Sequence, residues 1–141
     1  MKTKLLTTLF LTFAAPALAG EKVEMFRAAG CICCEKYADY LRASGYDVTI
    51  TEDQNFVDRA LATGMPEAGI GCHLALMDGY AMSGLIPVEF LNKLVKDKPD
   101  VTGIVEPGMP MDAPGMSDGP YGTYKVYAFA PGGVITEFAS E

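Results

Sequence analysis

The chain has 141 residues and a formal net charge of −7, from 18 acidic and 11 basic side chains. A length of this order suits one domain with a single hydrophobic core. The acidic balance argues against a nucleic-acid partner, because phosphate binding requires a basic surface. The sequence also has no phosphate-binding loop and no serine–histidine constellation, which argues against nucleotide-binding and hydrolytic functions.

The first 19 residues have the organisation of a secretory signal peptide. Lys2 and Lys4 precede an apolar run over residues 5–15, and the segment closes on a small-residue Ala-Leu-Ala ending. The apolar run is much shorter than the ~20 residues that cross a bilayer. We therefore expect residues 1–19 to be removed on export, with no membrane span remaining. Residues 20–141 are expected to form one domain located in the periplasm.

Apolar spacing predicts the order of strands and helices. Alternating apolar residues are typical of strands, and apolar residues three or four positions apart are typical of helices. The dipeptide Asp78-Gly79 indicates a tight hairpin turn, and Pro87 fits the first turn of a helix. We expect strands at 22–27, 46–51, 73–77 and 80–83, helices at 34–44, 56–63 and 87–96, and a closing hairpin at 123–138. This order predicts an α/β, thioredoxin-like fold, with a central mixed sheet, flanking helices and a C-terminal hairpin.

All four cysteines follow the leader, three in the string Cys31-Ile32-Cys33-Cys34 and one in the pair Cys72-His73. In an exported protein an even number of cysteines usually indicates structural disulfides. A bridge between near neighbours, however, closes almost no loop and restricts the unfolded chain little. A bridge from Cys72 to Cys31 or Cys34 would close a useful loop but leave two thiols unexplained. The pattern therefore favours a chemical role over a purely structural one.

The thiols are expected at a helix start. Cys31 and Cys34 have C-x-x-C spacing there, and the partial positive charge of a helix N-terminus stabilises the thiolate, which is both nucleophile and metal ligand. Cys72 and His73 precede the strand at 73–77, where thioredoxin-like proteins usually carry a cis-proline facing the reactive pair. In this fold we expect four sulfurs and one imidazole to converge.

A regular strand would separate Cys72 from His73. Consecutive side chains of a strand point to opposite faces, so the two can share a site only where the backbone is irregular. Gly69 and Gly71 precede the pair and make such irregularity plausible.

With these motifs the sequence resembles the CopG-like family, small exported proteins of copper-resistance systems that were long described as a domain of unknown function. The resemblance rests on the C-x-C-C motif at 31–34, the Cys-His pair at 72–73 and the methionine-rich segment 107–116. It implies a thioredoxin-like fold, periplasmic copper handling, and copper binding by cysteine and histidine, with redox activity as a further option. Ile32 departs from the family pattern, in which glycine is usual, and a β-branched residue restricts the backbone of a tight turn.

The choice of metal can also be argued from the ligands. Soft thiolates select Cu(I), zinc or iron–sulfur clusters. Zinc bound by three cysteines and a histidine is the main alternative, although such sites usually draw their cysteines from C-x2-4-C pairs. Adjacent Cys33 and Cys34 point in different directions, which suits several Cu(I) ions bridged by sulfur. The expected cofactor is therefore copper, as Cu(I) in a multinuclear cluster, with zinc as the alternative.

Candidate ligands extend beyond the cysteines. His73 is the only histidine of the chain, and its place next to Cys72 favours a ligand role over a structural one. Three methionines in the Pro/Gly-rich segment are soft thioether donors, or alternatively fill the core beneath a loop. The expected metal ligands are Cys31, Cys33, Cys34, Cys72, His73, Met109, Met111 and Met116.

Two functions of different class follow. The first is a periplasmic copper-binding protein of copper resistance or homeostasis, with copper ions and other copper-handling proteins as partners. The second is an oxidoreductase in which Cys31 and Cys34 are the catalytic pair and cycle between disulfide and dithiol, with or without copper redox chemistry. A thiol–disulfide enzyme needs only two exposed cysteines, so the additional Cys33, Cys72 and His73 favour metal retention.

Overall fold

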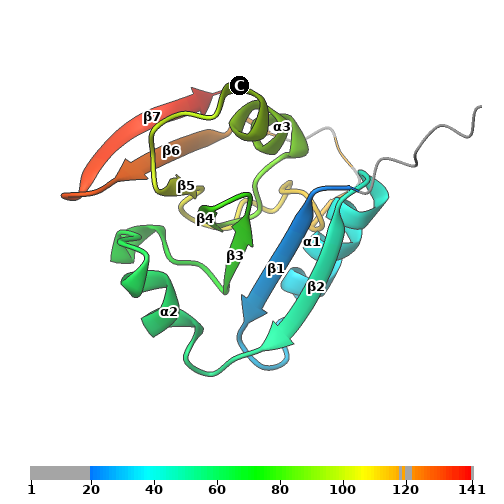
Figure 1. The fold of residues 1–141 in the computed structure, drawn as a ribbon. Helices are drawn as coiled ribbons and strands as arrows, with labels where there is room; N and C mark the ends of the chain where they lie inside the picture. The colour runs from blue at the N-terminus through cyan, green and yellow to red at the C-terminus, as the bar shows by residue number, and fades with distance from the viewer. Residues whose placement is uncertain (1–19, 118, 120–121, 141) are drawn as a thin grey trace, which may run out of the picture.

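A seven-stranded mixed sheet runs through the computed structural model, which describes residues 20–117, 119 and 122–140 (Figure 1). The leader expected at residues 1–19 lies outside these described residues. The strands are β1 (Lys22–Arg27), β2 (Asp47–Glu52), β3 (His73–Met77), β4 (Tyr80–Ser83), β5 (Gly103–Val105), β6 (Lys125–Ala130) and β7 (Val134–Ser140). The helices are α1 (Ile32–Ala43), α2 (Phe56–Ala62) and α3 (Val88–Asp97), with a single 3-10 turn at Glu67–Gly69.

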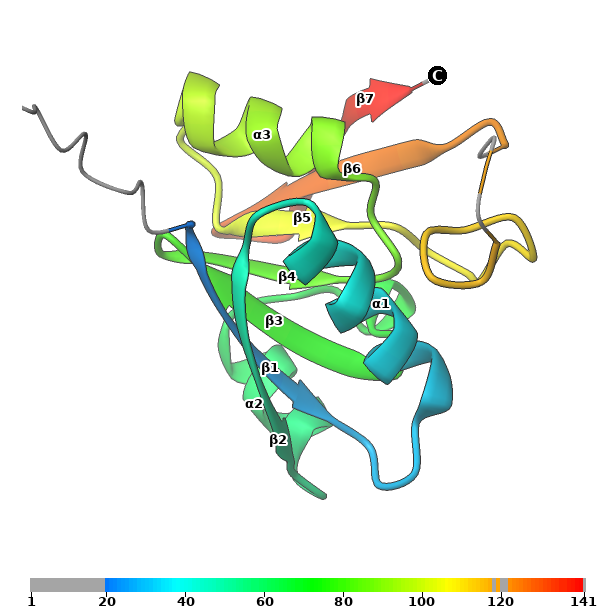
Figure 2. The same ribbon diagram turned by 90° about the vertical axis from the view of Figure 1, so that its right-hand side faces the viewer.

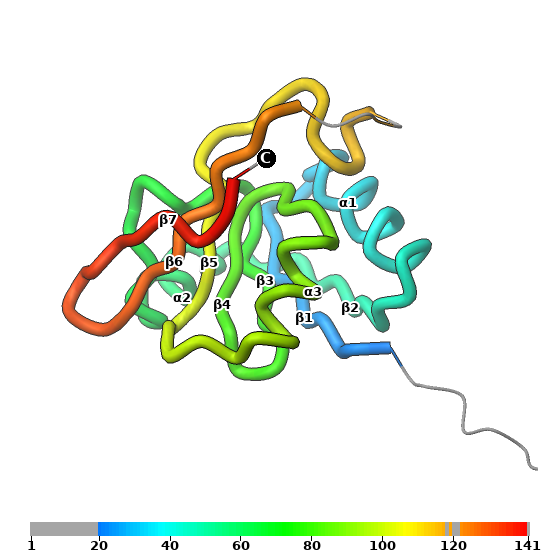
Figure 3. Tube along the Cα trace, turned by 90° about the horizontal axis from the view of Figure 1, so that it is seen from above, coloured from blue at the N-terminus to red at the C-terminus, as the bar shows by residue number. Residues whose placement is uncertain are grey.

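The sheet has the strand order β2-β1-β3-β4-β5-β6-β7, and helices cover both of its faces (Figures 2 and 3). Helices α1 and α3 bury Leu41, Leu91 and Leu94 in the larger hydrophobic cluster. Helix α2 contributes Ala60 to a separate, smaller cluster on the opposite face. The mixed α/β architecture, with its flanking helices and the C-terminal hairpin of β6 and β7, confirms the fold class expected from the sequence.

One turn agrees closely with the expected elements, and one strand was not expected. The β3–β4 hairpin turns at Asp78 and Gly79, whose φ angles of 47° and 85° are those of a tight turn between antiparallel strands. Strand β5 was not anticipated, because three residues between two loops carry too little periodicity to be recognised.

Helix α1 begins earlier than the predicted Cys34. Its first residue is Ile32, and Cys31 is the N-cap, whose sulfur accepts a hydrogen bond from the Cys34 N–H at 3.3 Å. A cysteine side chain thus takes the place that a serine or aspartate oxygen usually has at a helix start. The Ile32 side chain is 72% exposed, so the bulky residue is accommodated by pointing into solvent.

The pairing of β1 with β3 brings the two cysteine segments together. The strands are antiparallel, with Arg27 opposite His73, and just beyond this pair the Ala28 N–H donates to the Cys72 carbonyl at 3.1 Å. The turn that leads from β1 into α1 therefore lies against the entrance of β3. Positions 31–34 and 72–73 meet because of this register.

Gly84 directly follows β4, and its backbone lies close to Glu106, the residue that follows β5. Its φ is +103°, and a Cβ built on it would lie 2.4 Å from the Glu106 carbonyl oxygen. Any larger residue would therefore suffer both a steric clash and an unfavourable backbone conformation.

We predict that Gly84→Ala lowers the free energy of unfolding by at least about 2 kcal/mol, because both penalties apply. Gly64→Ala is the matched control: its φ of +84° is also positive, but no atom lies within 4 Å of the added Cβ. The control should lose only about 1 kcal/mol. Urea unfolding of the three proteins measures the difference, and equal losses in both variants would contradict the proposed clash.

Candidate metal centre

Three of the cysteine sulfurs form an outer group at the N-terminus of α1. The Sγ atoms of Cys31, Cys33 and Cys72 all lie within 4.8 Å of one another, and those of Cys31 and Cys33 are 3.3 Å apart. Two thiolates bound to one metal ion at ~2.3 Å with tetrahedral angles lie roughly 3.8 Å apart. These outer sulfurs could therefore hold a metal ion with only small side-chain movements.

An inner pair lies behind the outer sulfurs. Cys34 is fully buried, and its Sγ lies 3.8 Å from His73 Nδ1 and 3.6 Å from the Cys72 carbonyl oxygen. The backbone thus separates Cys72 and His73 as a strand would. Cys72 is exposed and joins the outer sulfurs, whereas His73 is buried and contacts Cys34.

Cys31 connects the two groups. In this structure it forms a disulfide with Cys34, while Cys33 and Cys72 are free thiols. Because the thiolate is the metal ligand, the disulfide form offers only part of the sulfur set. Reduction would release two further thiols, one in each group.

The electrostatics differ between the groups. Burial raises the pKa of the Cys72 thiol, and the neighbouring Cys33 raises it further, because two thiolates side by side repel each other. A bound cation would relieve that repulsion. Burial lowers the pKa of His73 to about 4, so its imidazole is neutral near pH 7, which is the form that ligates metals.

The methionines of segment 107–116 have three different environments. Met109 lines a small cavity of about 40 Å³ together with Cys33, Cys72 and His73, so its thioether is close to the sulfurs. Met111 is 79% exposed and does not line this cavity. Met116 packs against the larger core cluster and faces a groove beside α1.

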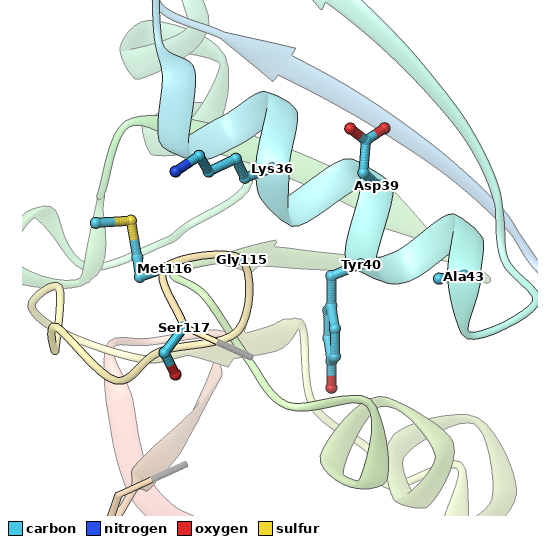
Figure 4. Close-up of a pocket in the computed structure, with 7 residues that line it drawn as sticks. All are labelled: Lys36, Asp39, Tyr40, Ala43, Gly115, Met116 and Ser117. Carbon is cyan, nitrogen blue, oxygen red and sulfur yellow. The ribbon is translucent and has the colours of Figure 1, made fainter. Parts of the chain in front are cut away.

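That groove, of about 630 Å³, is the larger hollow but contains none of the cysteines (Figure 4). Lys36, Asp39 and Tyr40 of α1 form one side, and Gly115 to Ser117 form the other. Its lining is largely polar and open to solvent, and Met116 is the one soft donor among the residues that line it.

Sequence reasoning missed two buried polar residues beneath the inner pair. The Tyr37 ring lies 5.6 Å from the His73 ring, and its hydroxyl donates to the Ile86 carbonyl at 2.8 Å. Glu106 is only 4% exposed. The signal for Glu106 was available, since an acidic residue directly ends the apolar run Gly103-Ile104-Val105.

Comparison with known proteins points to copper resistance. Residues 70–116, which include the Cys-His pair and the methionine segment, match a family model described as a protein of unknown function, DUF411. Two solved structures, titled copper resistance protein CopG forms 1 and 2, superpose with TM-scores of 0.77 and 0.78 at 28% sequence identity. The matches cover 85% and 86% of this chain and 96% and 98% of theirs. No protein with a curated description matches the sequence.

The resemblance to CopG-like proteins is confirmed. The similarity to CopG covers most of the chain, and the Cys31, Cys33 and Cys72 sulfurs form a group that could hold a metal ion. Among the described residues no helix is long and apolar enough to cross a bilayer.

We predict that the metal-free protein loses stability on acidification because of His73. Its imidazole has a pKa of about 4 in the folded state against an ordinary 6.5, so between these values the unfolded chain binds a proton that the folded chain does not. The free energy of unfolding should therefore fall as the pH drops through this window, by at most about 1.4 kcal/mol per pH unit.

The measurement is urea unfolding of wild type and His73→Gln at pH 7 and pH 5. The variant lacks the only imidazole of the chain, so other titrating groups cancel in the difference between the two proteins. We expect wild type to lose roughly 2 kcal/mol relative to the variant. A difference that stays constant with pH would show that the imidazole is accessible to protons in the folded state.

Proposed function

We propose that this protein binds Cu(I) in the periplasm as part of copper resistance, in a site formed by Cys31, Cys33, Cys34, Cys72 and His73. The observation that carries the proposal is the convergence of three sulfurs within 4.8 Å at a helix N-terminus, in a chain similar to CopG. In this proposal copper is the bound cargo, and the cysteine thiols are its main ligands.

The donor set fits Cu(I) better than a single zinc ion. His73 Nδ1, Cys34, Cys31, Cys33 and Cys72 follow one another as a chain of close neighbours rather than as the corners of one tetrahedron. A single tetrahedral ion uses four donors, so it would leave at least one of these five without a metal. Several Cu(I) ions bridged by sulfur would use the whole series, with Cys31 shared between inner and outer ions.

The methionines enter this proposal unequally. Met109 shares the cavity of Cys33 and Cys72 and is the thioether that can complete a copper coordination sphere there. Met111 and Met116 would reach the sulfurs only if the loop that carries them moved, so we assign them a secondary role in capturing or releasing copper.

We predict that the reduced protein takes up more than one Cu(I) per chain, because the sulfurs form two connected groups. Cys31→Ser/Cys34→Ser should lose most of this uptake with little loss of structure, since these residues close only a short loop. Elemental analysis and competition with a Cu(I) chelator measure the stoichiometry and affinity. One zinc ion with no copper uptake, or full copper occupancy of the double variant, would reject the site.

A second function is favoured by one observation, the Cys31–Cys34 disulfide itself. Cys31 is partly exposed, whereas Cys34 is buried. An incoming thiolate could therefore attack the Cys31 sulfur of the disulfide. A dithiol reductant would supply two electrons and two protons, leaving two protein thiols and an oxidised reductant. In this case the chain would be a thiol–disulfide oxidoreductase, and copper would compete for the reduced form.

The two functions are separable by a pair of matched double variants. We predict that Cys33→Ser/Cys72→Ser keeps the Cys31–Cys34 exchange with glutathione but loses most copper uptake, because two of the three outer sulfurs are gone. The Cys31→Ser/Cys34→Ser variant should lose both. Copper-resistance function alone would be supported if wild type binds copper but turns over a disulfide substrate no faster than free glutathione does.

A further inference from the structure

Two buried polar atoms beneath the site have no hydrogen-bond partner among the described residues: His73 Nε2 and Glu106 Oε2. Both residues are nearly inaccessible, with exposures of 2% and 4%. Leaving a buried polar atom unsatisfied costs about 1–3 kcal/mol, so two such atoms in one region require an explanation.

The strand register places these two residues in one row across the sheet. Ala75 of β3 is opposite Met82 of β4, and continuing this antiparallel pairing puts His73 opposite Gly84. Ser83 of β4 is opposite Val105 of β5, and the parallel pairing continues to Gly84 and Glu106. His73 and Glu106 are therefore second neighbours, separated only by Gly84.

Both side chains lie on the face that α1 covers. His73 contacts Cys34 and stacks near Tyr37, both on α1. Val105 faces the other side, where it packs against Gly69, so Glu106 must point back toward α1. Burial is the main cause that raises the pKa of the Tyr37 hydroxyl, and Glu106 makes the smallest of the contributions that raise it further.

Because Gly84 has no side chain, Glu106 can approach β4 closely: a Cβ built on Gly84 would lie 2.4 Å from the Glu106 carbonyl oxygen and 2.8 Å from its Cβ. Two strand spacings separate the backbones of β3 and β5 by ~10 Å. Each side chain, built from bonds of ~1.5 Å, spans roughly half of that gap. The adjoining cavity, lined by Gly84 and His73, has a volume of about 40 Å³ and can accommodate one water.

The carboxyl group of Glu106 is only partly satisfied. The Leu85 N–H hydrogen bonds to it, whereas Oε2 accepts nothing. Burial raises its pKa to about 7. A buried carboxyl with a free acceptor atom is a natural partner for an imidazole N–H, and histidines that ligate metals usually donate their second N–H to such a group.

We propose that Glu106 is a positioning residue for His73: one water accepts a hydrogen bond from the His73 Nε2–H and donates one to Glu106 Oε2. This bond fixes the tautomer in which Nδ1 carries the lone pair and faces Cys34. The imidazole is then ready to bind a metal ion beside the Cys34 sulfur without reorientation. This last consequence rests on the proposed copper function, whereas the hydrogen bond itself does not.

Nuclear magnetic resonance of the metal-free protein tests the bond directly. The chain has one histidine, so ¹⁵N labelling of histidine gives a single imidazole to interpret. We expect the proton on Nε2, with a sharp resonance that is protected from exchange with water. A proton on Nδ1, or an imidazole N–H too exchangeable to observe, would overturn the proposal from the wild-type spectrum alone.

Three variants connect the signal to Glu106. Glu106→Leu removes the acceptor, and we expect loss of the protected resonance. Glu106→Gln retains an acceptor oxygen and should preserve it, which a purely steric role for Glu106 would not require. Glu89→Leu, an exposed position on α3, is the control and should leave the spectrum unchanged. An unaltered imidazole resonance in a folded Glu106→Leu protein would overturn the proposal.

Copper affinity tests separately whether Glu106 positions His73 for metal binding. Loss of such a supporting hydrogen bond typically weakens metal binding by about 10–100-fold, and we expect this for reduced Glu106→Leu but not for Glu106→Gln. If wild type bound no copper, the proposed function would fail, while the imidazole spectrum would still decide on the hydrogen bond. If copper binding were intact in Glu106→Leu, the positioning role would be overturned.

Discussion

The antiparallel pairing of β1 with β3 is the constraint on which the site depends. It places Arg27 opposite His73 and connects the Ala28 N–H to the Cys72 carbonyl, so the turn into α1 is held against the start of β3. A change of register by one residue would exchange the faces of Cys72 and His73 and separate their side chains from the cysteines at 31–34. The sheet, rather than the loops, thus determines that the two cysteine segments meet.

The candidate ligands form two groups, the outer sulfurs and the inner pair of Cys34 and His73. Cys72 lies just before β3 and joins the sulfurs of Cys31 and Cys33, whereas His73, the first residue of β3, contacts Cys34. The outer sulfurs remain partly accessible, where an incoming ion can be exchanged, and the inner pair is enclosed by the core. The two depths suit a site that receives metal at the surface and holds it beneath.

The sequence predicted those parts of the fold that depend on turn residues, apolar spacing and the order of the strands. The Asp78-Gly79 hairpin, the strand at His73 and the meeting of the C-x-C-C and Cys-His segments follow from turn chemistry, periodicity and strand order. The disulfide between Cys31 and Cys34 could not be chosen from spacing alone, because neighbouring cysteines allow several pairings. The acidic residue at the end of the apolar run marked Glu106 as unusual, but the proposed link to His73 depends on cross-strand register, which no local pattern reports.

The disulfide joins the N-cap residue of α1 to a residue of its first turn, with Cα atoms 5.4 Å apart. Breaking it frees hardly any chain entropy, so the backbone can keep the same course with the bond open or closed. The disulfide and dithiol forms would then have almost the same hydrodynamic radius and the same far-ultraviolet circular dichroism spectrum. A partner that distinguishes the two states must therefore sense the chemistry at the helix tip itself, and not any change in molecular shape.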